Sequence, residues 1–245
     1  MKPRPILAAC CALPFLAAAA AANAEQASPW TASFTTRVEA LALLQSLNAE
    51  LLSHDSATLT LDHWCEAHRL ASPAKIVAER VAGADKPPTP ETRQLLGVGD
   101  SEPIRYRRVR LACGGHVLSE ADNWYVPARL TPEMNSALET TDIAFGRAVQ
   151  PLHFQRRTLS ATLLWSPLPP GWEMGAALPQ GDGKPLDIPP AVLEHRAILT
   201  LRTARQSAKW SSAIRAKCSP FRSRLSPDPS RGALGPRGRW RVEHR

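Results

Sequence analysis

The residues best suited to bind a charged ligand are four arginines between positions 105 and 110. They lie in a stretch, 104–111, that is rich in apolar, aromatic and β-branched residues, and a second such stretch covers 117–126. The pair Gly114-Gly115 between the two stretches is typical of a two-residue β-hairpin turn. The sequence therefore predicts a hairpin with arginines on one of its strands.

Counting outward from this turn assigns each arginine a partner on the other strand. Arg107 falls opposite Asp122, as in an ordinary cross-strand charge pair, and Arg108 falls opposite Ala121. An arginine that has no acid across from it can offer its planar guanidinium to a carboxylate ligand. A solvent-facing Arg108 on an open sheet face fits the same pattern, and the register alone does not decide between the two.

Two other groups of residues suggest chemistry at first sight. His63, Cys65 and His68 are metal-ligand types, but their spacing does not bring three ligands together on a helix and a fourth ligand is missing, so we expect no metal. His116 and Ser119 are the types used in nucleophilic hydrolysis, but no Gly-x-Ser-x-Gly elbow surrounds any serine. No catalytic residue is assigned from these groups.

The first 24 residues have the layout of a cleavable signal peptide. Lys2 and Arg4 precede an apolar run over 6–21, and Ala22-Asn23-Ala24 is a small-residue cleavage site. A lipoprotein site at Cys10 is the competing interpretation, but the apolar segment before it is too short. We therefore expect a periplasmic or secreted protein that keeps no stable membrane insertion after cleavage.

The net charge of +8 is concentrated at one end of the chain. From position 201 onward there are twelve Lys or Arg against two acids, in a context rich in Pro, Ser and Gly. Basic residues in such a tail are usually solvated, whereas nucleic-acid binding requires them on a folded face. We expect a monomer that binds no nucleic acid.

The body over 25–201 is long enough for one domain, and its elements indicate the α+β class. Apolar residues at helical spacing predict a helix over 37–52, and Thr131-Pro132 predicts the start of another. Strand patterns cover 154–165 and 192–201, and a Pro- and Gly-rich insertion over 166–190 separates them. Cys65 and Cys113 could form a disulfide in an oxidising compartment, and two buried thiols are equally compatible with the sequence.

Three segments of the body resemble the chorismate pyruvate-lyase family. Their order and spacing carry the resemblance, which covers about 41–201 without the insertion: Leu51–Thr58 resembles the family's substrate lid, Tyr106–Cys113 followed by Pro127 its central hairpin, and Phe145–Arg147 its Leu-Gly-Arg turn.

The resemblance implies a fold, an activity and a site. The fold is an antiparallel sheet of about six strands with flanking helices around an enclosed pocket, as in chorismate lyases and in the effector-binding UTRA domains of transcription regulators. The activity is the elimination of pyruvate from chorismate to give 4-hydroxybenzoate, without a metal or other cofactor. Arg108 would bind the substrate carboxylate, and the backbone N–H groups of Phe145 and Ala57 would add donors.

The chain differs from the family at the position of the family's active-site glutamate. The family has a Glu on the strand after 192–201, whereas this chain has the segment Arg202–Trp210, which lacks a Glu. GC-rich codons for 202–221, read two bases later, would encode a turn and a strand containing a Glu, so a frameshift is one account of the change. We expect 202–245 to be a basic tail that is disordered or out of frame. Two functions remain: a lyase with little activity, or a non-catalytic periplasmic binding module for a small aromatic or dicarboxylate ligand.

Overall fold

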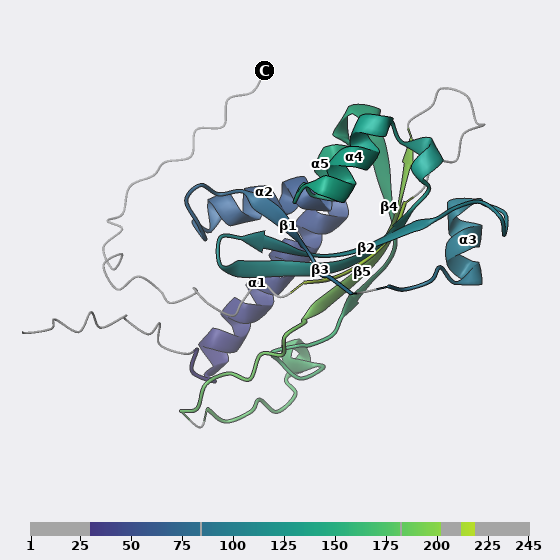
Figure 1. The fold of residues 1–245 in the computed structure, drawn as a ribbon. Coiled ribbons are helices and arrows are strands. Elements are labelled where there is room, and N and C mark those ends of the chain that lie inside the picture. The colour runs from purple at the N-terminus through teal and green to yellow at the C-terminus, as the bar shows by residue number, and fades with distance from the viewer. Residues whose placement is uncertain (1–29, 84, 182, 202–211, 219–245) are drawn as a thin grey trace, which may run out of the picture.

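The computed structural model describes residues 30–83, 85–181, 183–201 and 212–218 (Figure 1). The expected signal peptide, 1–24, and the segments 202–211 and 219–245 lie outside the described residues. The helices and strands are, in chain order, α1 (Phe34–Ser53), α2 (Ala57–Ala67), β1 (Ile76–Arg80), α3 (Pro90–Leu96), β2 (Arg105–Cys113), β3 (His116–Tyr125), α4 (Pro132–Thr140), α5 (Phe145–Ala148), β4 (Phe154–Leu163), β5 (Leu193–Leu201) and β6 (Ser212–Cys218), with 3₁₀ turns at Pro127–Arg129, Gln150–Leu152 and Trp172–Met174.

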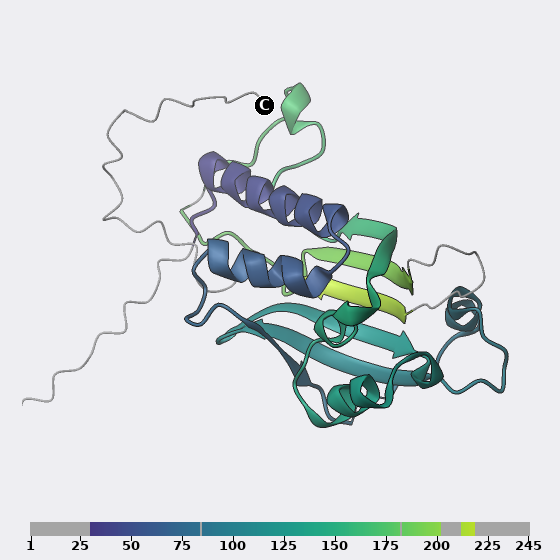
Figure 2. The ribbon, with the colours of Figure 1, turned by 90° about the horizontal axis from the view of Figure 1, so that it is seen from above.

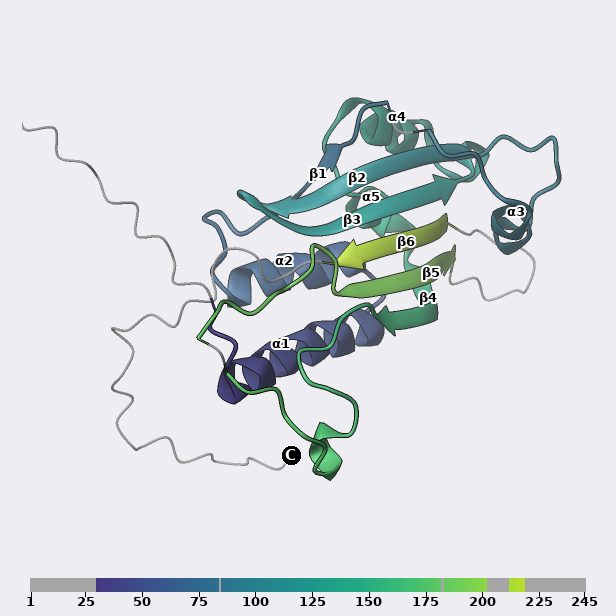
Figure 3. The ribbon, with the colours of Figure 1, turned by 90° about the horizontal axis from the view of Figure 1, so that it is seen from below.

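The strands form one antiparallel sheet in the order β1-β2-β3-β6-β5-β4, which Figure 3 shows from below. The α+β class and the antiparallel sheet expected from the sequence are confirmed. Hairpin β2-β3, with β1 at its outer edge, makes one half of the sheet and hairpin β4-β5 makes the other. Strand β6 joins them by pairing with both β3 and β5.

Strand β6 corrects the prediction made for the tail. Its seven residues fall inside 202–245, so the expectation of a disordered tail is wrong for Ser212–Cys218. The reason is local: Ile214, Ala216 and Cys218 alternate with basic residues, and this period of two is a strand pattern that the net charge of the tail conceals. In the present reading frame, the chain already supplies a strand at this place in the sheet.

The helices α1, α2, α4 and α5 all lie on one face of the sheet, and Figure 2 shows α1 and α2 side by side across it. The expected helix 37–52 lies within α1, whose buried side chains include Leu44, Leu47 and Leu51. These leucines belong to the main apolar cluster, together with residues of α2 and the strands. Helix α4 begins as expected, because the Thr131 hydroxyl accepts a hydrogen bond of 3.2 Å from the Met134 N–H.

The Pro- and Gly-rich segment 166–190 packs beside the beginning of α1. Ala32 donates a backbone hydrogen bond of 2.8 Å to the carbonyl of Lys184, and Thr31 forms a bridge with Pro185. The Arg37 side chain donates a hydrogen bond of 2.8 Å to the carbonyl of Pro167. The segment therefore makes specific contacts with the domain.

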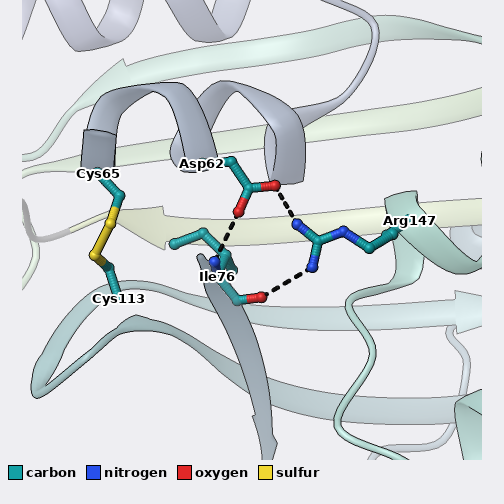
Figure 4. Close-up of a disulfide and its surroundings, with 5 residues drawn as sticks. All are labelled: Asp62, Cys65, Ile76, Cys113 and Arg147. Carbon is teal, nitrogen blue, oxygen red and sulfur yellow. Dashed lines mark hydrogen bonds and ion pairs between the residues drawn. A yellow bond between two sulfur atoms is a disulfide. The ribbon is translucent and has the colours of Figure 1, made fainter. Parts of the chain in front are cut away.

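A disulfide and an ion pair hold α2 against the sheet (Figure 4). Cys65 of α2 is bonded to Cys113 at the end of β2, which settles the alternative that the sequence left open. Asp62 of α2 pairs with Arg147 of α5, and both bind the backbone of Ile76 at the start of β1. Among the described residues, no helix combines the length and apolar character needed to cross a membrane.

Candidate ligand-binding cavity

A β-bulge in the central hairpin decides which arginine faces the helices. Cys113 pairs with His116 as counted from the turn, but Leu111 pairs with Ser119, so Leu118 is an extra residue on β3. Beyond the bulge, every partner shifts by one position. The predicted register is therefore wrong for the arginines.

Arg108 is the predicted carboxylate-binding residue, and the structure contradicts the register on which that prediction rested. It pairs with Asp122 in the register, where Ala121 was expected. Its side chain is 43% exposed and binds Glu120 at 3.1 Å. Successive residues of a strand point to opposite faces, so Arg108 faces away from the helices while Arg107 faces them.

An interior cavity of about 60 Å³ lies between the sheet and helices α1, α2 and α5. Its wall is mostly apolar and includes a residue from every strand except β1. The lining residues are Leu51, Asp55, Ser56, Ala57, Thr58, Leu61, Arg107, Val109, Leu111, Ser119, Ala121, Asn123, Phe145, Gly146, Phe154, Arg156, His195, Leu199 and Cys218.

Arg107 is the most unusual group in this wall. Its residue surface is only 7% exposed, and its Nη1 and Nη2 donate to the carbonyls of Ile143 at 2.9 Å and Thr141 at 3.4 Å. Its Nε is buried and has no hydrogen-bond acceptor, and within the described residues no carboxylate forms an ion pair with it. Burial lowers the pKa of Arg107, which reflects the cost of keeping an uncompensated cation out of water.

Ala57 and Phe145, the other two predicted site residues, do line the cavity. They are the first residues of α2 and α5, where backbone N–H groups have no partner within the helix. The two helix starts approach each other closely at Gly146, because a Cβ there would lie 2.9 Å from the Ser56 hydroxyl oxygen. A side chain at position 146 would therefore crowd the Ser56 and Thr58 hydroxyl groups at the start of α2.

A second arginine, Arg156, belongs to the cavity wall in the other half of the sheet, on strand β4. Its Nη1 donates to the Leu51 carbonyl at 2.8 Å, and its Nη2 lies 3.2 Å from His195 Nδ1. His195 Nε2 lies 2.9 Å from Asn48 Oδ1. Burial, and then Arg156, lower the pKa of His195 to about 4, so the ring is neutral at pH 7 and its Nδ1 accepts from the guanidinium.

The sequence did not single out Arg156, His195 or Cys218. Arg156 and His195 lie on strands that were predicted, so alternation along those strands could have placed them on a face, but nothing local showed which face is buried. Cys218 lies on β6, which was not predicted. Burial raises the pKa of its thiol to about 11, so it lines the cavity as a neutral group.

The three residues considered as metal ligands in the sequence, His63, Cys65 and His68, each contact a different partner in the structure. Cys65 is in the disulfide, His63 Nδ1 lies 3.8 Å from a Glu50 carboxylate oxygen, and the His68 ring stacks on Trp64 with centroids 4.0 Å apart. In the described part of the chain, no group of three or more His, Cys, Asp or Glu side chains is placed to hold a metal ion.

Comparison with curated proteins finds one strong similarity. The chain is 64% identical over 174 residues to a protein of Sinorhizobium fredii (strain NBRC 101917 / NGR234) named "Uncharacterized protein y4mC", and the match covers 71% of this chain and 73% of that protein. No protein-family model matches the chain.

Solved structures of bacterial transcriptional regulators are only weakly similar. PhnF from Mycobacterium smegmatis has a TM-score of 0.39 at 14% identity, covering 63% of this chain and 62% of that chain. The PhnF effector domain has a TM-score of 0.37 at 12% identity, covering 63% of this chain and 86% of that chain. The possible regulator YydK from Bacillus subtilis has a TM-score of 0.35 at 15% identity, and this chain spans 58% of its length. A likeness of this strength transfers no property of the regulators to this chain.

Proposed function

The chain belongs to the same family as y4mC of Sinorhizobium fredii, and we propose that its interior cavity binds a small organic carboxylate without converting it. The observation that carries this proposal is the state of Arg107. A buried guanidinium with an unsatisfied Nε and no ion pair among the described residues is costly, and a bound carboxylate removes that cost.

The rest of the wall sets the chemistry of the ligand. Val109, Leu111 and Phe154 are apolar and suit an aromatic or aliphatic body, while the start of α2 at Ala57 offers a further donor. The resemblance to chorismate pyruvate-lyases supports 4-hydroxybenzoate and chorismate as the first compounds to test. A chorismate-lyase-like fold for the domain belongs to the same proposal.

The described wall supports binding in preference to turnover. Pyruvate elimination requires a group that moves a proton, with a pKa near the working pH. His195 has a pKa of about 4 and both ring nitrogens engaged, and the Cys218 thiol has a pKa of about 11. The one carboxylate among the described lining residues, Asp55, accepts a backbone hydrogen bond from Arg156 at 3.0 Å.

The proposal includes export of the protein from the cytoplasm to the periplasm or the medium. The Cys65–Cys113 disulfide supports an oxidising compartment, which agrees with the signal peptide expected at 1–24. The monomeric state and the lack of nucleic-acid binding stay predictions.

Calorimetric titration with 4-hydroxybenzoate, comparing Arg107→Gln with Arg110→Gln, tests the function. Loss of a charge-assisted contact costs about 2–3 kcal/mol, so we expect Arg107→Gln to weaken binding by roughly 30- to 150-fold. Arg110→Gln removes the same charge from the exposed face, where Arg110 pairs with Glu120, and is expected to bind like the wild type.

Two results would contradict the proposal in different ways. Equal affinities of the two variants would show that Arg107 does not contact the ligand. Release of pyruvate when chorismate is added, followed by a coupled assay, would show that the protein is a lyase and not a binding module.

A further inference from the structure

A second pocket, here called the outer pocket, lies beside the interior cavity. It has a volume of about 510 Å³ and is formed by the end of β1 and the loop after it, β2, the end of β3, and α4. Its lining residues are Arg80, Val81, Ala82, Arg105, Tyr106, Arg107, Arg108, Tyr125, Leu138 and Glu139.

Arg107 lines both the outer pocket and the interior cavity. The reason lies in the period of the strands, since every second residue of β2 points to the helix face. Leu111 and Val109 line the interior cavity, Arg107 comes next, and Arg105 lines the outer pocket. The helix face of β2 therefore runs without a break from one space to the other, with Arg107 at the boundary.

Two aromatic rings, one from β3 and one from α5, also lie at the boundary between the two pockets. Tyr125 lines the outer pocket, Phe145 of α5 lines the interior cavity, and their ring centroids lie 5.4 Å apart. The boundary thus includes one guanidinium and two aromatic rings.

The outer pocket is rich in positive charge. Arg105 pairs with Glu139, the acid of this pocket, and Arg108 pairs with Glu120 outside it. Arg80 donates to the backbone carbonyl of Glu139, and among the described residues no carboxylate forms an ion pair with it.

Arg80 and Arg107 are also close enough to affect each other. Burial lowers the pKa of Arg107, Arg80 lowers it further, and Tyr125 and Asp142 act in the opposite direction. Two neighbouring cations that lack a carboxylate partner attract an anion to the space between them.

We propose that the outer pocket is the anion entrance of the interior cavity: a small carboxylate is first held between Arg80 and Arg107 and then moves past Arg107 into the cavity. This inference rests on the proposed function, because it concerns how the same ligand reaches the same site. The entrance cations act mainly on the rate of association, whereas Arg107 acts on the stability of the complex.

Stopped-flow fluorescence with 4-hydroxybenzoate as the probe separates these effects. Arg80→Gln is expected to lower the association rate constant at least about threefold in low salt, and the difference from wild type is expected to vanish in about 0.5 M NaCl. Arg110→Gln is the matched control, because Arg110 lies on the same sheet but is 51% exposed on the other face, where it pairs with Glu120.

A variant that narrows the entrance gives an independent readout. Ala82 is an exposed lining residue of the outer pocket, so Ala82→Trp fills the pocket without changing the core. If the ligand passes this way, the association and dissociation rate constants fall by the same factor and the Kd stays unchanged.

The possible failures are distinct. If the wild type binds 4-hydroxybenzoate but Arg80→Gln and Ala82→Trp both behave like Arg110→Gln, the entrance is wrong and the cavity proposal stands. If calorimetry gives two bound molecules and Ala82→Trp removes one of them without changing either rate constant of the other, the outer pocket is a separate site and not an entrance. If the wild type binds neither 4-hydroxybenzoate nor benzoate, both proposals are overturned.

Discussion

Arg156 keeps its position in the cavity wall through a neutral histidine. His195 accepts from Arg156 through Nδ1 and reaches Asn48 through Nε2, so a single tautomer satisfies both contacts. A protonated His195 would have no acceptor for Arg156 and would place a second positive charge beside it. The arrangement therefore holds only while the ring stays neutral.

The stability of the protein is expected to fall as the pH decreases from about 6.5 to about 4. The pKa of His195 is 6.5 in the unfolded chain and about 4 in the fold, so the unfolded state binds more protons in this window. The contribution of His195, about 2 kcal/mol after allowance for solvent screening, is fully present above pH 6.5 and is lost toward pH 4.

Denaturant unfolding of wild type and His195→Gln at pH 7, 5.5 and 4.5 measures this contribution. The variant is expected to be less stable at pH 7 and to show a flatter pH dependence. His68, whose pKa burial also lowers, contributes to both proteins alike. Parallel pH curves for the two proteins would show that His195 is not the responsible group.

At the scale of the elements, β6 supplies the middle of the sheet. It pairs with β3 from Ser119 to Trp124 and with β5 from Leu193 to Leu199, so both hairpins need it to satisfy their inner edges. Cys218 also contributes to the cavity wall.

We expect a chain that stops after position 211 to be unfolded or aggregated, because β3 and β5 would each present an unpaired edge. A chain that stops after Cys218 keeps all six strands and is the matched control. Circular dichroism and thermal unfolding of the two proteins provide the measurement. A cooperative transition in the shorter chain at the temperature of the longer one would show that β6 does not belong to the sheet.

The sequence predicts those elements that local residues determine. The hairpin turn lies at Gly114 as expected, with a φ of 56°, and Thr131 caps α4, because each depends only on its neighbours in the chain. The bulge at Leu118 depends on tertiary packing: it lets both Leu118 and Ser119 turn inward, each no more than 2% exposed. Counting from the turn could not include it, and the counted register therefore placed Ala121 opposite Arg108, where the structure has Asp122.

At the scale of the whole molecule, one covalent link joins the helix layer to the sheet. Cys65 and Cys113 are 48 positions apart in the sequence, and their Cα atoms lie 6.2 Å apart. The link is close to the cavity, since Leu61 of α2 and Leu111 of β2 belong to its wall.

Replacing both cysteines by serine is expected to lower the free energy of unfolding by about 3–4 kcal/mol, because a closed loop of this length restricts the unfolded chain. Urea unfolding of the double variant, and of wild type with and without a reductant, measures the effect. Cys218→Ser controls for the burial of a hydroxyl group in place of a thiol. An unchanged midpoint on reduction of the wild type would contradict a stabilising disulfide.

The central position of β6 also has a consequence for the order of events during synthesis. Strands β1 to β5 leave the ribosome before residue 212, but their two hairpins cannot be joined into one sheet until residue 218 has been made. The pairs between β3 and β6 connect residues about ninety to one hundred positions apart, and such distant contacts form slowly. The six-stranded sheet therefore cannot be complete until residue 218 has been synthesised, although local helices and hairpins can form earlier.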